Sequence, residues 1–197
     1  MAMNELTRRG LIFGAAAVAA AGVFAGVDRV ATSAFVKPEP PLQPDAEVEI
    51  VEFDDSGKRA GKRTVRKVQK TLAEWEAILT TPQFVVTRKA GTEIPYSGEL
   101  LNEHRAGIFR CVDCDTALFD AKTKFESGTG WPSFWAVLAA ENVHERDDFS
   151  LGILQREVKC ARCDAHLGHV FTDGPDPTGL RYCMNSVALK FVARRDA

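Results

Sequence analysis

The sequence predicts a mainly β domain of antiparallel strands with a short helical segment near its start. Three observations support this fold class. From residue 84 onward the chain is a series of short apolar runs separated by turn residues. The regular alternation of strands and helices that builds a parallel sheet is missing from the pattern. The stretch 180–192 has the longest and cleanest strand pattern of the chain.

Length and composition are those of a globular domain with an extension. The chain has 197 residues, of which 45% are hydrophobic and 26% are charged, which excludes a collagenous, low-complexity or wholly disordered protein. The net charge of −2 provides no basic surplus for nucleic acid or an anionic membrane. Five cysteines are an odd number, so at least one thiol lies outside any internal pair.

The first 34 residues resemble a twin-arginine export signal. Arg8 and Arg9 precede an uncharged run rich in Ala and Gly over residues 10–27, and residues 32–34 (TSA) are small enough for a cleavage site. The run is also long enough for an uncleaved membrane anchor, which is the alternative. Both interpretations predict a periplasmic protein that meets the membrane only through this segment. Cleavage after residue 34 would leave 22 basic and 25 acidic residues, a net charge of −3.

The expected domain occupies residues 46–197 and begins with a hairpin and a helix. Residues 35–45 are a Pro-rich linker, because proline fixes φ and removes a hydrogen-bond donor. Alternating residues over 48–53 and 64–68 flank a turn-rich stretch and predict the hairpin. Thr71 and Glu74 form a capping box for a helix that ends before Pro82. The predicted short strands that follow include the runs 84–87, 107–109, 152–154 and 168–171.

Two C-x-x-C pairs predict a metal site. Cys111 and Cys114 form the first pair, Cys160 and Cys163 the second, and 45 residues separate the two pairs. Together they supply the four thiolates of a structural zinc site, and such a clip over a long loop favours stability. Disulfides or redox pairs are the alternatives in an oxidising compartment, and iron could occupy the same cage. We favour zinc, because twin-arginine export carries proteins that have already folded with their metal.

The fifth cysteine, Cys183, is the candidate nucleophile. On a strand it shares a face with Arg181 and Asn185, because residues two apart point the same way. A neighbouring cation lowers the pKa of a thiol and stabilises the reactive thiolate. The alternative is a buried, inert cysteine, which is the commoner fate of a single thiol.

Two histidines make the reactive interpretation stronger. His166 and His169 follow the second Cys pair, and a bulge at Gly168 would bring both imidazoles to one face of a strand. Imidazole is well suited to deliver a proton near neutral pH. A role as a zinc ligand is the alternative, although the four cysteines already complete a tetrahedron.

At this point the chain resembles the peptide methionine-R-sulfoxide reductase (MsrB) family. The resemblance covers roughly residues 70–192 and rests on several motifs in order. These are GTEIPYSG (91–98), CVDC (111–114), KFESGTGWPSF (124–134), CARCDAHLGHVF (160–171) and DGPDPTGLRYCMNS (173–186).

The resemblance implies a β-tent fold, two antiparallel sheets with a structural zinc ion held away from the active site. It implies that Cys183 attacks the sulfoxide sulfur of an oxidised methionine and becomes a sulfenic acid. The other positions have implied roles of three kinds. His166, His169 and Asn185 would hold and protonate the departing oxygen, Trp131 and Phe171 would bind the substrate, and Asp173 and Arg181 would set the environment of the thiolate.

One departure from the family concerns recycling. Many members have a second cysteine at the position of Thr129, and threonine has no thiol. With four cysteines assigned to metal, none remains to resolve the sulfenic acid. We therefore expect an external thiol or a thioredoxin-like protein to reduce it.

Three other functions fit parts of the pattern. A zinc-knuckle binding module without catalysis would need only the two Cys pairs, and a zinc hydrolase would use His166 and His169 as ligands at an open metal position. A thiol redox sensor would oxidise Cys183 once rather than turn over. The preferred hypothesis is a monomeric oxidoreductase that repairs exported proteins under oxidative stress. Its partners are oxidised methionine residues of proteins and a thiol reductant, with no nucleic acid.

Overall fold

The computed structural model describes residues 41–43, 45–149, 152 and 154–194. The chain divides into two units, residues 1–39 and 40–197, and everything that follows concerns the second. The predicted export signal lies outside the described residues, as does most of the predicted linker. No helix within the described ranges is long and apolar enough to cross a membrane.

Two antiparallel sheets form the body of the domain, as the predicted fold class requires. The larger sheet has the strand order β5-β6-β10-β9-β8-β7, and the smaller one has the order β11-β3-β4. The strands of the larger sheet are β5 (Lys124–Phe125), β6 (Ser133–Phe134), β7 (Val143–Asp148), β8 (Gln155–Cys160), β9 (His166–Phe171) and β10 (Arg181–Met184). Those of the smaller sheet are β3 (Gly107–Cys111), β4 (Ala117–Asp120) and β11 (Leu189–Ala193), and 3₁₀ turns lie at η1 (Ala121–Thr123), η2 (Ala140–Asn142) and η3 (Ser186–Ala188).

An aromatic cluster joins the two sheets. Phe119 of the smaller sheet stacks on Phe134 of the larger one with a centroid distance of 4.4 Å, and Phe109 meets Phe134 edge-on at 4.9 Å. All three rings are fully buried. Tyr182 on β10 packs against the same cluster. Burial of such rings is the main favourable term in the core, so this contact fixes β10 firmly against the smaller sheet.

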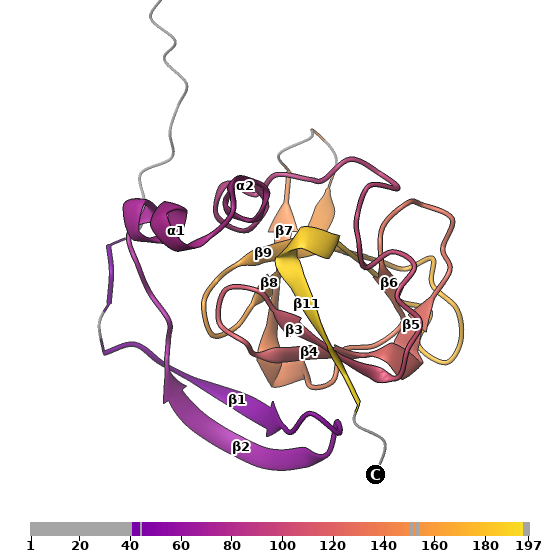
Figure 1. Cartoon of the computed structure of the whole chain (residues 1–197), viewed down its shortest axis with the longest axis horizontal. Helices are drawn as coiled ribbons and strands as arrows, with labels where there is room; N and C mark the ends of the chain where they lie inside the picture. Colours follow the sequence, from indigo (N-terminus) through magenta and orange to yellow (C-terminus); the bar gives the residue numbers. More distant parts are fainter. Residues whose placement is uncertain (1–40, 44, 150–151, 153, 195–197) are drawn as a thin grey trace, which may run out of the picture. The chain divides into compact units, whose positions relative to one another are not determined.

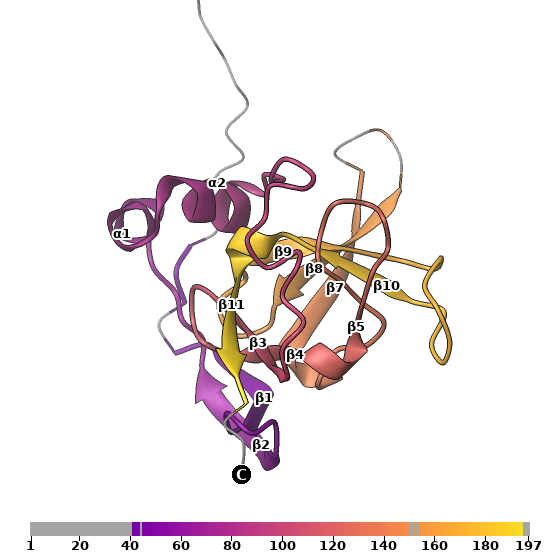
Figure 2. The ribbon, with the colours of Figure 1, turned by 45° about the vertical axis from the view of Figure 1, so that its right-hand side comes forward.

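The predicted hairpin is present, and the buried amide of Asn142 is one of the groups that attach it to the body. It consists of β1 (Glu47–Phe53) and β2 (Arg59–Arg66), so its second strand begins earlier than expected. Asn142 is fully buried, and its side chain bonds the N–H and C=O of Val51 at 2.8 Å each and the carbonyl of Ala117 at 2.7 Å. Figures 1 and 2 show the helices near one end of the two sheets and the hairpin near the other.

The first helix is as predicted, and a second one corrects the prediction. Helix α1 (Leu72–Ile78) begins at Thr71 with the expected capping box to Glu74. The run 84–87, expected to be a strand, belongs to helix α2 (Thr81–Lys89). Thr80 and Gln83 form a second capping box there, and Pro82 lies in the first turn, where proline is tolerated. These start signals outweigh the strand preference of Val85 and Val86.

The long strand expected over 180–192 is also corrected. The chain forms β10, turns through η3, and continues as β11 in the other sheet. The carboxylate of Glu93 accepts hydrogen bonds from the N–H groups of Ser186 and Val187 at the turn. A partner distant in sequence therefore breaks a run whose apolar pattern is continuous. Residues 152 and 154 of another expected run lie in the connection before β8.

Candidate active site and metal centre

Cys183 lies on β10, one of the two middle strands of the larger sheet, on the face away from the aromatic core. Its neighbours Tyr182 and Met184 point into the core and are buried, so alternation along β10 turns Cys183 to the other side together with Arg181. The thiol is half-buried, and Cys183 pairs with Ser133 on β6 and with His169 on β9. The sequence-predicted nucleophile is therefore partly accessible and lies next to β9, the strand that carries both expected histidines.

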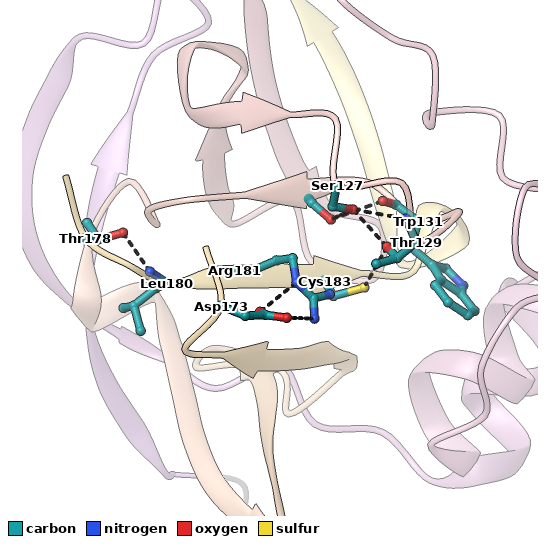
Figure 3. A network of polar contacts seen from close by, with 9 residues as sticks. Ser127, Thr129, Trp131, Asp173, Thr178, Leu180, Arg181 and Cys183 are labelled. Carbon is teal, nitrogen blue, oxygen red and sulfur yellow. Dashed lines mark hydrogen bonds and ion pairs between the residues drawn. The ribbon is translucent and has the colours of Figure 1, made fainter. Parts of the chain in front are cut away.

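Hydroxyl groups line one side of the Cys183 sulfur. Thr129 Oγ1 lies 3.8 Å from Sγ, and Ser127 Oγ bonds both Thr129 Oγ1 at 2.8 Å and Ser133 Oγ at 2.7 Å (Figure 3). Thr129, at the position where the resemblance led us to look for a second cysteine, is thus in direct contact with the nucleophile. Here it belongs to a chain of three hydroxyls that can donate to a negative sulfur.

The pKa of the Cys183 thiol differs from the expectation that the cation of Arg181 would lower it. Burial raises the pKa of the Cys183 thiol, while hydrogen bonds from Thr129 and Ser133 and the positive charge of Arg181 lower it. Burial is the largest of these effects, and the resulting pKa lies above the ordinary value. Arg181 acts in the predicted direction but does not outweigh burial, so the resting site holds a thiol that ionises readily only with further help.

Arg181 is held by a salt bridge and an aromatic ring. Its Nε and Nη2 donate to the two carboxylate oxygens of Asp173, each at 2.8 Å (Figure 3). Its guanidinium lies 4.3 Å from the ring centre of Phe171, which pairs with Arg181 across β9 and β10. The bidentate geometry fixes the direction of the cation, so Asp173, Phe171 and Arg181 act as one unit beside Cys183.

The predicted bulge on β9 is present and brings the two histidines together. On β8, Val158 and Lys159 are adjacent, but their partners on β9 are Gly168 and His166, so one extra residue lies on β9. The rings of His166 and His169 are 5.4 Å apart. Gly168 permits this geometry, because a Cβ atom there would lie 2.1 Å from the carbonyl oxygen of Cys183. Glycine at this position lets β9 approach β10 closely.

Each histidine has a carboxylate partner that sequence analysis missed. His166 Nδ1 lies 2.7 Å from Glu157 Oε1, and His169 Nε2 lies 2.9 Å from Asp148 Oδ2. Glu157 is only 2% exposed and also bonds Arg146. Burial opposes its ionisation, but hydrogen bonds from His166 and Arg146 lower the pKa of Glu157 to about 2. An ionised carboxylate fixes the orientation and tautomer of the imidazole that it contacts.

The only sequence signal for these carboxylates is weak. Glu157 is a charged residue within a strand-like run, and nothing in its spacing relates it to His166. Asp148 follows several other charged residues and reads as surface. Both contacts depend on the pairing of β7, β8 and β9, which the sequence does not specify.

Trp131 and Asn185 are both tied to the segment that contains Glu93. The indole N–H of Trp131 donates to the carbonyl of Glu93 at 3.1 Å, and the N–H of Glu93 donates to Asn185 Oδ1 at 3.0 Å. Asn185 Nδ2 donates to the carbonyl of Leu167 at 3.1 Å. The amide of Asn185 therefore links this segment to β9, and the half-buried ring of Trp131 is oriented from the same segment.

The four remaining cysteines form one cluster. The Sγ atoms of Cys111, Cys114, Cys160 and Cys163 all lie within 4.8 Å of one another, and the nearest pairs are 3.5 and 3.6 Å apart. A disulfide needs about 2.05 Å, and all five cysteines are free thiols. A metal–sulfur distance of about 2.3 Å gives tetrahedral edges of about 3.8 Å, which this cluster matches. The four cysteines could hold a metal ion.

The chemistry of the cluster also fits a cation. Hydrogen bonds with the other thiols and burial raise the pKa of Cys111 well above its usual range, and burial raises that of Cys163. Four thiolates would not ionise together in this place without a divalent ion to compensate their charge. His166 and His169 lie outside the cluster. This is the only such group of ligands in the part of the chain that the structure describes.

Arg88 connects the metal cluster to the helices. From α2 it donates to the carboxylate of Asp113 between the first two cysteines and to the carbonyl of Cys163 at 2.8 Å. Its guanidinium lies 4.0 Å from the ring centre of Trp75 on α1. One side chain thus holds both Cys pairs and both helices.

Together these residues form a site with a thiol on one strand and two carboxylate-held imidazoles on the next. A nucleophile and a proton source facing a common space can cleave a polar bond to sulfur or carbon. The pairing of β9 with β10 holds both groups in place, and neither histidine belongs to the cysteine cluster.

Comparison with known proteins narrows this chemistry. Residues 79–193 match the SelR domain family. The chain is 53% identical over 133 residues to a Pseudomonas putida protein, with 68% of this chain and all of the relative covered. It is 56% identical over 128 residues to one from Pseudomonas syringae pv. syringae, which covers 65% of this chain and 98% of the relative. Both relatives are named peptide methionine sulfoxide reductase MsrB.

Proposed function

The chain belongs to the SelR domain family, and we propose that it is an oxidoreductase that converts methionine-R-sulfoxide in proteins to methionine. The observation that carries this proposal is the half-buried thiol of Cys183 paired across the sheet with His169, in a chain that matches the family over most of its domain. The preference for the R isomer rests on the family alone. The named relatives act as peptide methionine sulfoxide reductases.

In the proposed first step the Cys183 thiolate attacks the sulfoxide sulfur. The sulfur–oxygen bond of the substrate breaks and the oxygen ends on Cys183, so methionine and a cysteine sulfenic acid are formed. A proton must reach the oxygen, because a sulfoxide sulfur becomes electrophilic only when its oxygen is protonated or strongly hydrogen-bonded. His166 and His169 supply this proton, and Asn185 helps to hold the oxygen.

Binding of the substrate favours ionisation of the Cys183 thiol to the thiolate. Arg181 and the hydroxyls of Thr129 and Ser133 favour the negative sulfur, while burial disfavours it. A bound sulfoxide adds its own positive sulfur to the favourable side and shifts the balance toward the thiolate. The ring of Trp131 packs against the methyl group of the substrate, and Phe171 closes the site beside Arg181.

Recycling of the sulfenic acid depends on an external reductant. Two thiol groups from outside reduce it to the thiol, and water and a disulfide of the reductant are the products. The support is the contact of Thr129, which has no thiol, with Cys183 and the clustering of the other four cysteines elsewhere.

A Thr129→Cys variant tests this recycling scheme. After one turnover without reductant, mass spectrometry of the variant should find a disulfide between residues 129 and 183, because the two side chains already touch. The wild type should show an oxidised Cys183 without any disulfide. A disulfide involving Cys183 in the wild type would refute the scheme.

The bound metal is zinc and its role is structural. The support is the tetrahedral spacing of four thiols, a set that includes neither histidine. Zinc would be held by Cys111, Cys114, Cys160 and Cys163 and would clip the β3–β4 turn to the β8–β9 turn. Metal analysis of the purified protein decides between zinc and iron.

The enzyme acts in the periplasm on exported proteins. The support is the Arg8-Arg9 pair before an apolar run, which resembles a twin-arginine signal. Cell fractionation of the full chain should place it outside the cytoplasm, and changing Arg8 and Arg9 to Lys should retain it inside. Equal distribution of the two proteins would contradict this location.

The reaction itself is tested with a peptide that carries separated R or S methionine sulfoxide and with dithiothreitol as reductant. Many turnovers on the R peptide and none on the S peptide are expected. A folded, metal-loaded sample without turnover on either peptide would refute the proposed function and favour a binding role.

A further inference from the structure

Glu93 directs three polar groups to different parts of the candidate active site. Its backbone carbonyl accepts the indole N–H of Trp131 at 3.1 Å, and its backbone N–H donates to Asn185 Oδ1 at 3.0 Å. Its carboxylate accepts the N–H groups of Ser186 at 2.6 Å and Val187 at 3.0 Å. The side chain thus fixes the backbone of residue 93, and that backbone contacts the ring and the amide that are expected to bind the substrate.

The segment that follows Glu93 is held against the same two parts of the chain. The N–H of Tyr96 donates to the carbonyl of Gly130 at 2.8 Å, in the loop before β6. The N–H of Leu100 donates to Ser186 Oγ at 2.7 Å, in the turn after β10. This segment therefore bridges the loop and the turn, and a shift of its first residue would change the distance between them.

The carboxylate of Glu93 is a firm anchor in a closely packed place. The side chain is half-buried, and burial raises the pKa of its carboxyl above the ordinary value, although the two N–H groups of the turn oppose this effect. A Cβ atom at Gly98 would lie 2.7 Å from Glu93 Oε1, so the segment packs tightly around the carboxylate. Hydrogen bonds to an ionised carboxylate are about twice as strong as neutral ones. The carboxylate therefore holds residue 93 more firmly than an amide would.

Trp131 and Asn185 lie on the two segments that adjoin the nucleophile. Asn185 follows Cys183 by two residues, and Trp131 precedes Ser133, the β6 partner of Cys183, by two residues. In the proposed reaction the ring packs against the methyl group of the substrate and the amide helps to hold its oxygen. Both substituents of the sulfoxide sulfur must be placed together for the thiolate to reach it, and a misplacement of about 1 Å can reduce a rate about a hundredfold.

We propose that Glu93 is a positioning residue that sets the distance between the ring of Trp131 and the amide of Asn185 and so places the sulfoxide in front of Cys183. This role rests on the proposed function, to which the substrate contacts of the ring and the amide belong. Glu93 acts through these two side chains and not on the reacting atoms. Methyl packing is the same in ground and transition states and affects KM, whereas the hold on the oxygen strengthens in the transition state and affects kcat.

The experiment introduces Glu93→Gln into the full chain and uses the R-sulfoxide peptide with saturating dithiothreitol. The new amide accepts only one of the two N–H groups of the turn and presents its own NH₂ group to the other. The kcat/KM should fall about tenfold or more, the range for one lost hydrogen bond to a charged group, with a lower kcat and a higher KM. Glu99→Gln, at an exposed position of the same segment, is the matched control and should behave like the wild type.

Two further backgrounds show which side chains transmit the effect. In Trp131→Phe, which keeps a ring but removes the indole N–H, Glu93→Gln should still lower kcat but no longer raise KM. In Asn185→Ala, Glu93→Gln should still raise KM but no longer lower kcat. The rate of Cys183 alkylation by iodoacetamide should be the same in Glu93→Gln as in the wild type. Metal content and thermal unfolding show that each variant is folded, and Glu93→Asp, which keeps the charge but shortens its reach, replaces Glu93→Gln if that variant does not fold.

Each contrary result has a distinct meaning. A kcat/KM in Glu93→Gln within twofold of the wild type would overturn Glu93 as a positioning residue. The same changes in kcat and KM in all three backgrounds, or a parallel slowing of Cys183 alkylation, would show that Glu93 only supports the fold, and would overturn the positioning role as well. Failure of the folded, metal-loaded wild type to reduce the peptide would instead overturn the proposed function.

Discussion

At the scale of single residues, the reactivity of Cys183 depends on a balance between burial and its polar neighbours. Burial raises the pKa of the thiol above its ordinary value, and Arg181 opposes this effect. The rate of Cys183 alkylation by iodoacetamide should therefore still be rising with pH at about 9, the ordinary thiol value.

The Arg181→Met variant should shift that alkylation profile to higher pH. Peptide mapping separates Cys183 from the four clustered cysteines in this measurement. A rate that has already levelled off at neutral pH in the wild type would show that the thiolate is stabilised in the resting site, against this account.

The Glu157–His166 pair makes a prediction about stability. The pKa of Glu157 falls from 4.5 to about 2 on folding, so the ionised form stabilises the fold. This contribution is complete above pH 4.5 and is lost as the pH falls toward 2. Between about pH 6 and about pH 3 the wild type should lose more free energy of unfolding than Glu157→Gln does.

Urea denaturation of both proteins at both pH values checks this expectation. Both proteins contain the four clustered cysteines. The difference between their free energies of unfolding therefore excludes the pH dependence of that cluster. Glu76→Gln, at an exposed position on α1, is the control and should behave like the wild type. Parallel losses in the wild type and Glu157→Gln would contradict the pairing.

Residues with specific chemistry are those that the sequence alone could single out as candidates. Five cysteines and two histidines stand out by type and spacing, and the structure brings Cys183 and the histidines onto adjacent strands and the other four thiols into one cluster. Glu157, Asp148 and Glu93 were missed, because their roles come from strand pairing and from a turn far away in the sequence. Nothing local distinguishes them from surface acids.

At the scale of elements, the bulge on β9 makes the geometry of the site possible. A side chain at Gly168 would collide with the backbone of Cys183 on β10. Gly168→Ala should separate the two strands, lower the free energy of unfolding by about 2 kcal/mol or more, and strongly reduce turnover.

Gly61→Ala is the matched control for this prediction. Gly61 on β2 has a φ of 134° against 155° for Gly168, but a Cβ atom there would meet nothing within 4 Å. Thermal unfolding and turnover are measured for both variants. Gly61→Ala shows the effect of the positive φ alone, whereas Gly168→Ala adds the collision with β10. Equal effects of the two substitutions would show that close approach of β9 and β10 is unimportant.

Elements were predictable where a local signal begins or ends them. The capping box at Thr71 marks α1 correctly. The equivalent signal at Thr80 and Gln83 begins α2, although the β-branched residues after it led us to expect a strand. The break in the run 180–192 could not be predicted, because the groups that stabilise the turn belong to Glu93.

At the scale of the whole molecule, the metal cluster ties distant parts of the chain together. It joins turns 45 residues apart in sequence, and Arg88 extends the connection to both helices. Removal of the metal with a chelator should lower the midpoint of thermal unfolding by about 10 °C or more, because a loss of several kcal/mol has that effect in a domain of this size.

Two variants test the metal prediction, one at a ligand of the cluster and one at a cysteine outside it. Cys163→Ser should lose the metal and unfold at the lower temperature, while Cys183→Ser should retain both metal and stability. Calorimetry with parallel metal analysis is the measurement. A chelated protein that unfolds at the original temperature would show that the cluster is not a structural metal site.

In the proposed reaction Cys183 takes the oxygen from the sulfoxide. The most direct test is a single turnover of the full chain with a slight excess of the R-sulfoxide peptide and no reductant, followed by quenching and mass spectrometry. We expect one methionine released per chain and one added oxygen on the fragment that contains Cys183, with neither product in Cys183→Ser. Release of methionine by Cys183→Ser, or an added oxygen on any other residue of the wild type, would contradict it.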